Sequence, residues 1–395
     1  MNSVSGHTLG RPAGPRYNLR SLSPPTRRTV GFLRHNFLPP SETFIYTSLR
    51  ALDRYAVRVF ALRREQAAKF PYDDVVALGD SWLGWVEAQL YRMTTGSPRF
   101  FRWAKSVGLI HAHMGYTGVH GLWAAQRFGL PLVTSFYGKD VTLRQSLVRL
   151  DPTYWHFWAR ARELFAKGDR FLVLSNHMRR ALVEQGCPDD KIRVVPLGVD
   201  LDRFGAPRAR RTGRCTVLMV GREVDKKGFD DGLRACAAAR DQGADLRVVL
   251  HGTGGPLNGR LRRLADELRL AVEWPEPSRP VPQTMADADV LLVPSRTARD
   301  GDQEGTPTVI CEGSAAQLPV VSTRHAGIPE QVDDGATGLL AAERDVEALA
   351  GHLVRLARDP DLRVTLGAAG RDKMLREYSV AAHRRNLQAV YDELL

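Results

Sequence analysis

Cysteine is scarce in this sequence: the 395 residues contain four, and each is separated from the next by at least 20 residues. Zinc sites usually draw on close cysteine pairs, and no such pair occurs. Scattered cysteines in a chain of this length are typical of reduced thiols in a cytoplasmic protein. We therefore expect Cys187, Cys215, Cys236 and Cys311 to be free thiols.

Long apolar runs are absent as well. No stretch approaches the ~20 apolar residues of a membrane-spanning helix, and none near the start has the character of a signal-peptide core. Residues 1–28 also lack acidic side chains, while they carry five arginines and several prolines and serines. We expect them to form a disordered basic tail, with contact to a membrane surface as the alternative.

The charge of the chain is uneven. Residues 1–200 contain 28 Lys and Arg against 15 Asp and Glu, a balance of +13, whereas the whole chain carries +12. A basic first half attracts the phosphates of a lipid, a nucleic acid or a substrate. No known nucleic-acid module or stacked aromatic and basic motif accompanies it, so we expect no nucleic-acid partner.

Short β-rich runs alternate with helical stretches from residue 29 onward. Thr29–Leu33 has the composition of a strand, for example, and Val346–Arg358 that of a helix. This alternation predicts parallel sheets covered on both faces. The pattern breaks in a segment rich in Pro, Gly and Arg and then restarts. We expect an α/β protein with two Rossmann-like doubly wound domains, at residues 29–200 and 201–378, and a last helix at 379–395.

The most informative segment is EGTPTVICE, residues 304–312, between two expected strands. Pro307 suits the first turn of a helix, where its missing N–H costs nothing, and the free amides of that turn form an anion site with the helix dipole. Glu304 precedes the helix and can reach into a cleft, whereas Glu312 lies on the helix. A pair of solvated surface acids is the alternative.

A second signal follows the first strand of the second domain, in VGREVDKKGF, residues 220–229. Arg222 and Lys227 flank the turn after Gly221. Arginine can clamp two phosphate oxygens and lysine supplies a point charge, and ligands of open α/β sheets sit beyond the carboxyl ends of strands. With segment 304–312, this turn predicts a diphosphate site, and a charged solvent-exposed loop is the alternative.

These segments, together with VVPLGVDLDRF at 194–204 and GIPE at 327–330, resemble glycosyltransferase family 4, the retaining enzymes with the GT-B fold. The resemblance reaches across most of residues 190–395. It implies two Rossmann-like domains that face a cleft, with the final helix crossing back to the first domain.

The resemblance also implies roles. Arg222 and Lys227 are expected to hold the donor diphosphate, Glu312 to bind the nucleotide ribose, and Glu304 to lie beside the donor sugar. The backbone around the helix start is expected to support the phosphates or the sugar. The residues concerned there are Gly305, Thr306, Pro307 and Thr308.

The first half contains SETF at 41–44, IHAHMGYTG at 110–118 and TSFYGKDVT at 134–142, which are similar to exopolysaccharide and colanic-acid-type glycosyltransferases. By this resemblance His113 and Tyr137 are catalytic candidates. Many relatives have a histidine where Tyr137 stands, and a tyrosine can donate a hydrogen bond but is no proton switch near neutral pH. The acceptor or sugar side is assigned to Ser41, Glu42, Thr43, Gly138 and Asp140.

Two further patterns bear on cofactors. Asp287–Asp289 and Asp300–Asp302 match the short D-x-D pattern of metal-dependent glycosyltransferases, but the GT-B fold uses protein cations and helix dipoles instead, so we expect no metal and no other cofactor. We also expect His111 and His113 to point to opposite faces of their strand, and so not to share a metal ion.

Two other signals are weak. The turn that begins with His251 and Gly252 lacks the full dinucleotide fingerprint, and we assign it to the nucleotide side of the cleft. The aromatic side chains of Trp82, Trp85 and Phe100–Phe101, with nearby arginines, could touch a lipid acceptor. A helix that simply packs its aromatic residues is the alternative.

The sequence thus predicts a retaining, metal-independent glycosyltransferase. The expected donor is a nucleotide diphosphate sugar such as a UDP-sugar, and the acceptor a glycan or polyprenyl-linked glycan of exopolysaccharide biosynthesis. We expect the enzyme in the cytoplasm, with its basic first half against an anionic inner-membrane surface. The alternatives are a natural-product or other small-molecule glycosyltransferase, a nucleotide-sugar epimerase of the same fold, and a catalytically silent scaffold.

Overall fold

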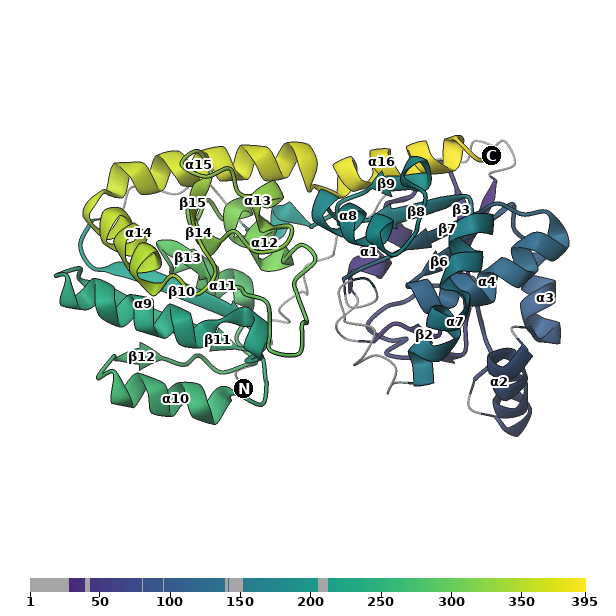
Figure 1. Ribbon diagram of the computed structural model, residues 1–395, viewed down its shortest axis with the longest axis horizontal. Coiled ribbons are helices and arrows are strands. Elements are labelled where there is room, and N and C mark those ends of the chain that lie inside the picture. The colour runs from purple at the N-terminus through teal and green to yellow at the C-terminus, as the bar shows by residue number, and fades with distance from the viewer. Residues whose placement is uncertain are drawn as a thin grey trace, which may run out of the picture.

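The computed structural model describes residues 28–39, 43–79, 81–94, 96–138, 141, 152–204 and 212–395. They form two α/β units, each built on a parallel sheet, arranged along the long axis of the molecule (Figure 1). Residues 1–27 of the expected basic tail lie outside this range. Within the range, no helix is both long and apolar enough to cross a membrane.

The first sheet has seven strands among the described residues, in the order β5-β3-β1-β6-β7-β8-β9, and all of them are parallel. Its inner strands are nearly continuous apolar runs because helices cover both faces. The strands are β1 (Thr29–Leu33), β3 (Ala56–Ala61), β5 (Val75–Ala77), β6 (Leu109–His113), β7 (Leu132–Ser135), β8 (Arg170–Val173) and β9 (Ile192–Val194). The helices are α1 (Thr43–Ala51), α2 (Trp82–Thr94), α3 (Pro98–Ala104), α4 (Gly115–Phe128), α7 (Pro152–Lys167) and α8 (Asn176–Glu184).

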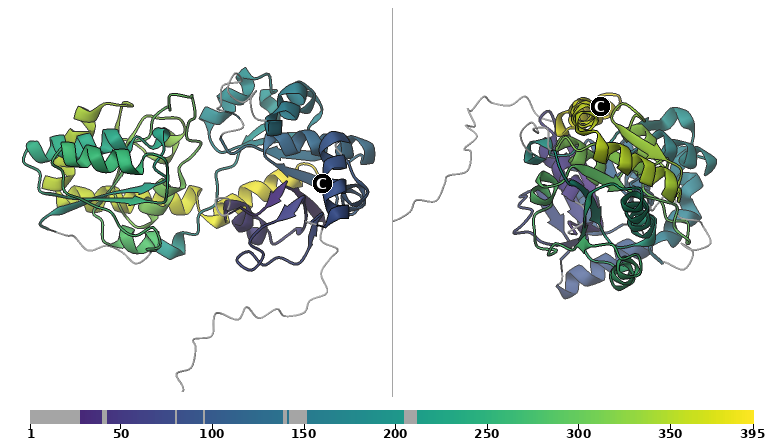
Figure 2. Two further views of the ribbon diagram at one scale, coloured as in Figure 1. Left: turned by 90° about the horizontal axis from the view of Figure 1, so that it is seen from below. Right: turned by 90° about the vertical axis from the view of Figure 1, so that its left-hand side faces the viewer.

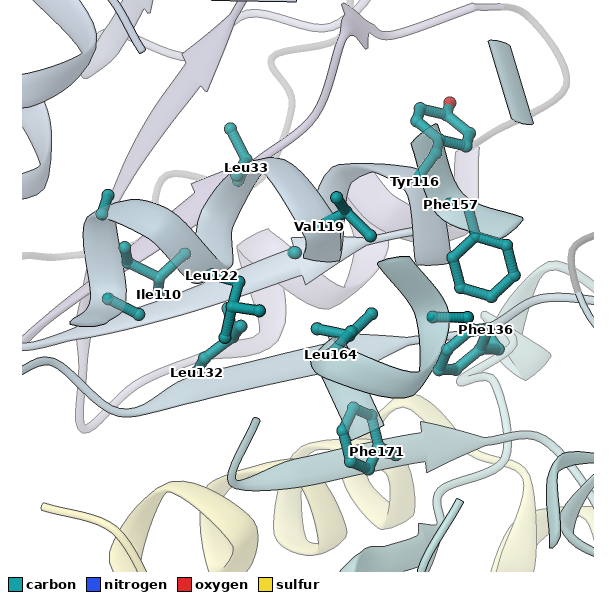
Figure 3. Close-up of a cluster of buried hydrophobic side chains, with 14 of the residues drawn as sticks. Leu33, Ile110, Tyr116, Val119, Leu122, Leu132, Phe136, Phe157, Leu164 and Phe171 are labelled. Atoms are coloured by element: carbon teal, nitrogen blue, oxygen red, sulfur yellow. The ribbon is translucent and has the colours of Figure 1, made fainter. Parts of the chain in front are cut away.

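The main core of the first unit lies between the sheet and helices α4 and α7. Figure 3 shows Leu122 of α4 beside Ile110 of β6 and Leu132 of β7, and Phe157 of α7 beside Phe136. All five side chains are buried. Full burial of such a side chain contributes roughly 1.5–3 kcal/mol, so this cluster holds the strand ends that border the cleft described below.

The second sheet has six parallel strands in the described chain, in the order β12-β11-β10-β13-β14-β15. The strands are β10 (Cys215–Gly221), β11 (Leu246–Gly252), β12 (Val272–Glu273), β13 (Val290–Val293), β14 (Val320–Thr323) and β15 (Gly338–Ala341). The helices of this unit are α9 (Phe229–Asp241), α10 (Asn258–Glu267), α11 (Val281–Ala286), α12 (Thr308–Ala315), α13 (Ile328–Gln331), α14 (Val346–Arg358) and α15 (Pro360–Glu377). The boundary expected after residue 200 falls between β9 and β10.

The short elements complete the structure. A two-stranded pairing joins β2 (Asn36–Phe37) to β4 (Arg63–Arg64). Single helical turns of the 3₁₀ type are η1 (Asp189–Lys191), η2 (Leu201–Phe204) and η3 (Asp225–Lys227).

The chain returns to the first unit at its end. Helix α15 runs along the second unit, and α16 (Val380–Asp392) continues over the first (Figures 1 and 2). On α16, Nε2 of His383 lies 2.8 Å from the hydroxyl of Ser48 in α1, and the hydroxyl of Tyr391 lies 2.6 Å from Nδ1 of His111. The expected GT-B arrangement, with a final helix crossing back to the first domain, is therefore confirmed.

Candidate active site

Residues from both units line a cleft of about 360 Å³, a size typical of small-molecule sites. The first unit contributes the end of β7, with Tyr137 and Gly138, and Phe44 from α1. The second contributes Arg222 after β10 and the loop between β13 and α12. The cleft is thus formed at the carboxyl ends of strands, as expected for doubly wound sheets.

Two cations line the second-unit side of the cleft. Arg222 is exposed there, and no carboxylate of the described chain lies within ion-pair distance of it. Lys226, which was not among the predicted residues, also lines the cleft, with its Nζ 3.2 Å from Asp302 and 3.2 Å from the carbonyl of Gln303. A phosphate group placed here would meet an exposed guanidinium and an ammonium that Asp302 and Gln303 hold in position.

Lys227 is placed differently from the expectation. Its Nζ forms a 2.8 Å ion pair with Oε1 of Glu304, and it is not one of the cleft-lining residues. The turn that carries it is closed by Gly228, which has φ of +61° and whose Cβ, if present, would lie 1.9 Å from the carbonyl oxygen of Pro294. Glycine is therefore required at this position, and the turn is held tightly against the end of β13.

The two glutamates of segment 304–312 differ in their surroundings. Glu304 is buried, so the alternative of a solvated surface acid is wrong for it. Burial alone would raise the pKa of Glu304, but Lys227 and Lys226 outweigh it and hold that pKa below its usual value. Glu312 is half-buried on α12, and burial raises its pKa, with Arg203 and Lys227 opposing. Glu304 is therefore a carboxylate at neutral pH.

The start of α12 faces the loop that carries Glu304. Pro307 is the N-cap residue and the helix begins at Thr308, so the expectation of Pro307 in the first turn is off by one residue. No side chain caps this end of the helix, which leaves backbone N–H groups and the positive end of the dipole for an anion. Gly305 and Thr306 line the cleft, whereas Pro307 and Thr308 are not among its lining residues.

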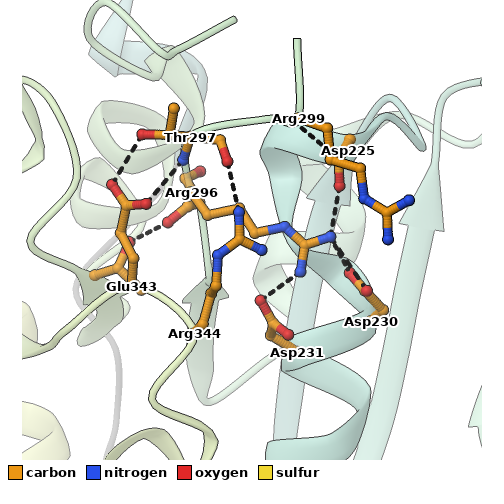
Figure 4. A network of polar contacts seen from close by, with 10 residues as sticks. Asp225, Asp230, Asp231, Arg296, Thr297, Arg299, Glu343 and Arg344 are labelled. Atoms are coloured by element: carbon orange, nitrogen blue, oxygen red, sulfur yellow. Dashed lines mark hydrogen bonds and ion pairs between the residues drawn. The ribbon is translucent and has the colours of Figure 1, made fainter. Parts of the chain in front are cut away.

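A polar network that sequence reasoning missed holds both ends of this loop, and Figure 4 shows its part around Arg296 and Glu343. At its start, Arg296 is buried between Asp225, Asp230 and Asp231, at distances of 2.6, 3.0 and 2.6 Å. The backbone amide of Thr297 donates to Glu343 over 2.9 Å.

At the far end of the loop, the backbone amide of Glu304 donates to His325, and His325 contacts Glu343. In the sequence, the position of His325 just before the GIPE segment is the signal that could have pointed to this residue, and it is a weak one.

On the first-unit side, His113 and Tyr137 form a pair. Nδ1 of His113 lies 2.6 Å from the hydroxyl of Tyr137, and Tyr137 reaches the cleft. Burial and the neighbouring His111 lower the pKa of His113 well below its usual value. The expectation that His111 and His113 point to opposite faces is wrong: their rings stack with centroids 4.2 Å apart, because residues two positions apart on a strand share a face.

The other predicted residues fall into three groups. Ser41, Glu42 and Asp140 lie outside the described residues, and Thr43 is the first residue of α1. Gly138 lines the cleft with φ of +129°. Gly221 ends β10, and His251 and Gly252 end β11; these three are not among the cleft-lining residues.

The four carboxylates of the D-x-D patterns have protein partners. Asp287 pairs with Arg279 at 2.6 Å, and Asp302 with Lys226. Asp289 accepts a hydrogen bond from the amide of Thr216, and Asp300 from the amide of Asp302. The described residues contain no cluster of three or more side chains that could hold a metal ion. The four cysteines are free, as expected, and all four are buried.

Two parallel-sheet units with a cleft between them that Arg222 and Lys226 line, and a returning C-terminal helix, define the class of GT-B glycosyltransferases. Comparison with known proteins supports this and gives the family. Residues 41–203 match the model of "Glycosyltransferase Family 4", and residues 214–359 that of "Glycosyl transferases group 1". The chain belongs to glycosyltransferase family 4.

Two relatives and one solved structure illustrate the match. WcaL of Salmonella typhimurium, whose name assigns it to colanic acid biosynthesis as a glycosyltransferase, is 35% identical over 71% of this chain and 69% of its own length. The amylovoran biosynthesis glycosyltransferase AmsK of Erwinia amylovora is 32% identical over 71% and 69%. The Anabaena protein Alr3699/HepE, solved in complex with UDP, is 17% identical with a TM-score of 0.74, over 93% of this chain and all of that one.

Proposed function

We propose that this glycosyltransferase moves a sugar from a UDP-sugar, with retention of the anomeric configuration and without a metal ion, to a glycan or polyprenyl-linked glycan in exopolysaccharide biosynthesis. The relatives named for colanic acid and amylovoran biosynthesis support the pathway class. The structural neighbour in complex with UDP supports the donor base. The reaction takes place in the cytoplasm, at the inner face of the membrane.

The observation that carries the proposal is the meeting of Arg222 and Lys226 in one cleft with Gly305 and Thr306, the residues that lead into the uncapped start of α12. In the reaction the bond between the anomeric carbon and the diphosphate oxygen breaks, and negative charge grows on the leaving group. Cations and backbone amides aimed at that charge give the kind of stabilisation that is usually largest in catalysis. Glu312 accepts hydrogen bonds from the ribose hydroxyls.

The acceptor hydroxyl attacks on the face that the diphosphate leaves, and its proton passes to a leaving phosphate oxygen. Glu304 is ionised and therefore donates no proton; its carboxylate fixes Lys227 and stabilises positive charge at the anomeric carbon. On the opposite side of the cleft, Tyr137 is held by the neutral ring of His113 and orients a sugar hydroxyl.

Donor binding tests the proposal directly. Isothermal titration calorimetry with UDP, GDP and ADP should give a measurable affinity for UDP that Arg222→Ala weakens. Arg234→Ala removes an exposed arginine from α9 and serves as the matched control. Binding of GDP or ADP in preference to UDP would contradict the base, and an unchanged affinity in Arg222→Ala would contradict the site.

Turnover tests the chemistry. Proton NMR of the product should show the anomeric configuration of the donor, and removal of metal ions by EDTA should leave the rate unchanged. Conversion of the donor sugar in the absence of any acceptor would identify an epimerase instead. An inverted product would overturn the retaining mechanism while leaving the donor site in place.

A further inference from the structure

Helix α2 presents an apolar face to solvent. Six of the ten large apolar side chains exposed in the described chain lie on this one helix. The most exposed are Trp82 at 74% and Met93 at 79%. The others are Leu83, Trp85, Val86 and Leu90. The alternative that the tryptophans of this helix pack into the protein is therefore wrong, although Phe100 in the next helix is fully buried.

The pattern along α2 is the reverse of an ordinary surface helix. Trp82, Val86, Leu90 and Met93 follow one another at helical spacing, so they form a single stripe on the outer face. The face toward the protein is made of Gly84, Ala88 and Tyr91. Gly84 and Ala88 let the helix lie close to the domain, and Tyr91 is its one large side chain that is fully buried among those described.

The stretch of chain that begins with α2 is also rich in cations that have no carboxylate partner in the described chain. Segment 81–128, from α2 through α4, contains five Lys and Arg and one acid, Glu87. Arg99 pairs with Glu87 at 2.5 Å. The remaining four are exposed, and within the described chain none has a carboxylate at ion-pair distance. They are Arg92, Arg102, Lys105 and Arg127.

The position of α2 in the fold also leaves its exposed face accessible to a large external surface. It projects from the end of the first unit that lies away from the second unit (Figure 1). It follows β5, an outer strand of the sheet, at the carboxyl end of that strand. The cleft-lining residues Tyr137 and Leu174 follow β7 and β8, toward the other edge of this sheet, so a surface that bound α2 would contact the first unit at the edge away from the cleft.

We propose that α2 is a membrane-docking element that places Trp82, Val86, Leu90 and Met93 at the headgroup level of an anionic bilayer, with Arg92 of the same helix and the exposed cations of the following segment on lipid phosphates. Tryptophan is favoured at that depth, and an apolar helix face with basic flanks is the composition of interfacial helices. The charge selects an anionic lipid surface over an apolar protein groove. The purpose of the docking rests on the membrane-linked acceptor proposed above, but the contact itself does not involve the donor site.

The test uses the full chain and sedimentation with vesicles of pure phosphatidylcholine or of phosphatidylcholine with phosphatidylglycerol. The wild type should bind the anionic vesicles at low salt. Trp82→Gln/Met93→Gln should weaken this binding at least about tenfold, because two large apolar side chains no longer enter the bilayer. Arg92→Gln/Arg102→Gln should weaken it by about fivefold for each cation removed.

The matched control is Val364→Gln/Leu375→Gln, which changes two exposed apolar residues with the same spacing of eleven positions on α15. It should bind vesicles as the wild type does. All variants should keep the calorimetric affinity for UDP, so that a failure of docking and a failure of the donor site are separated. Quenching of wild-type tryptophan fluorescence by brominated lipids gives a second measurement that needs no apolar-face variant.

Three results would overturn the proposal. The first is equal vesicle binding by wild type and Trp82→Gln/Met93→Gln. The second is failure of the wild type to bind anionic vesicles at low salt. The third is a dimer of the wild type in light scattering that the same variant converts to a monomer without any change in vesicle binding, because a second copy would then be the partner of α2.

Discussion

The backbone amide of Glu304 donates a hydrogen bond to Nε2 of His325 over 3.1 Å. A ring nitrogen that accepts carries no proton, so the proton of the neutral imidazole lies on Nδ1, which donates to Glu343 over 2.6 Å. Burial lowers the pKa of His325, although Glu343 opposes this effect. His325 therefore fixes the position of Glu304 through the backbone, and it is a positioning residue of the donor loop.

Replacement of His325 tests this role. His325→Phe removes the acceptor and the donor together, so the loop shifts and kcat/KM should fall about 100-fold, the scale expected for a displacement of about 1 Å. His325→Gln can still accept from Glu304 and donate to Glu343, and it should retain more activity. Steady-state kinetics of the folded variants measures kcat/KM. Equal losses of kcat/KM in both variants would contradict the hydrogen-bond role of His325.

The sequence predicted the elements whose signals are local. Strand Thr29–Leu33 and helix Val346–Arg358 occur as expected, because apolar periodicity and length define them without help from neighbours. Strand β15 and helix α3 were not predicted. Each is short, and β15 is ordered by pairing with β14 along its whole length, an interaction that no local pattern reveals.

In the candidate site, too, the residues with a local sequence signal were predicted and the contacts between distant residues were not. Arg222 and Glu304 were expected at one strand edge, and both lie there. The partners of Arg296, His325 and Glu343 could not be predicted, because each contact joins residues 18 to 71 positions apart. For the same reason Lys227 was expected to face phosphate, whereas it pairs with Glu304, 77 residues farther along the chain.

The ion pair between Lys227 and Glu304 should be strongly coupled. Their side chains are only 15% and 10% exposed, so removing one partner leaves a largely buried charge unpaired. Lys227→Met and Glu304→Gln should each lower the free energy of unfolding by about 3 kcal/mol, and the double variant by less than the sum. Urea denaturation measures the coupling.

A surface pair provides the control for this cycle. Arg247 and Glu273 lie 2.6 Å apart with side chains 40% and 54% exposed, and such pairs contribute at most about 1 kcal/mol. The coupling free energy of Lys227 and Glu304 should exceed that of this surface pair. If it does not, the buried ion pair is not held as described.

Glu330 links the two units. Its carboxylate accepts hydrogen bonds from the backbone amides of Asn176 and His177, at 2.8 and 3.0 Å, at the start of α8. A negative charge is favoured at that end of a helix. Glu330→Gln puts an amide N–H₂ against these donors, so the units should separate more readily.

The measurement is small-angle scattering, in which the radius of gyration of Glu330→Gln should exceed that of the wild type. Glu347→Gln alters an exposed glutamate in the first turn of α14 and is the control. Identical scattering of Glu330→Gln and wild type would mean that this contact does not hold the units together.

Histidine burial makes the stability of the first unit depend on pH. His111 lies between Ser135 and Tyr391, and burial, with a smaller effect of His383, lowers its pKa to about 3. In the unfolded chain the pKa is about 6.5, so between these values the unfolded state binds more protons. The contribution of neutral His111 to the free energy of unfolding is therefore fully present well above pH 6.5, and it is lost as the pH falls from 6.5 toward 3.

From this one residue the free energy of unfolding should be about 1.4 kcal/mol lower at pH 5.5 than at pH 7.5. His111→Gln removes the titrating group. The free energy of unfolding of this variant should therefore drop less between pH 7.5 and pH 5.5 than that of the wild type, by about this amount. Urea denaturation at both pH values measures the difference, and His352→Gln on α14 is the control. If His111→Gln loses as much stability as the wild type on acidification, the proton is taken up elsewhere, and the contact between β6 and the C-terminal helix is not the acid-sensitive part of the fold.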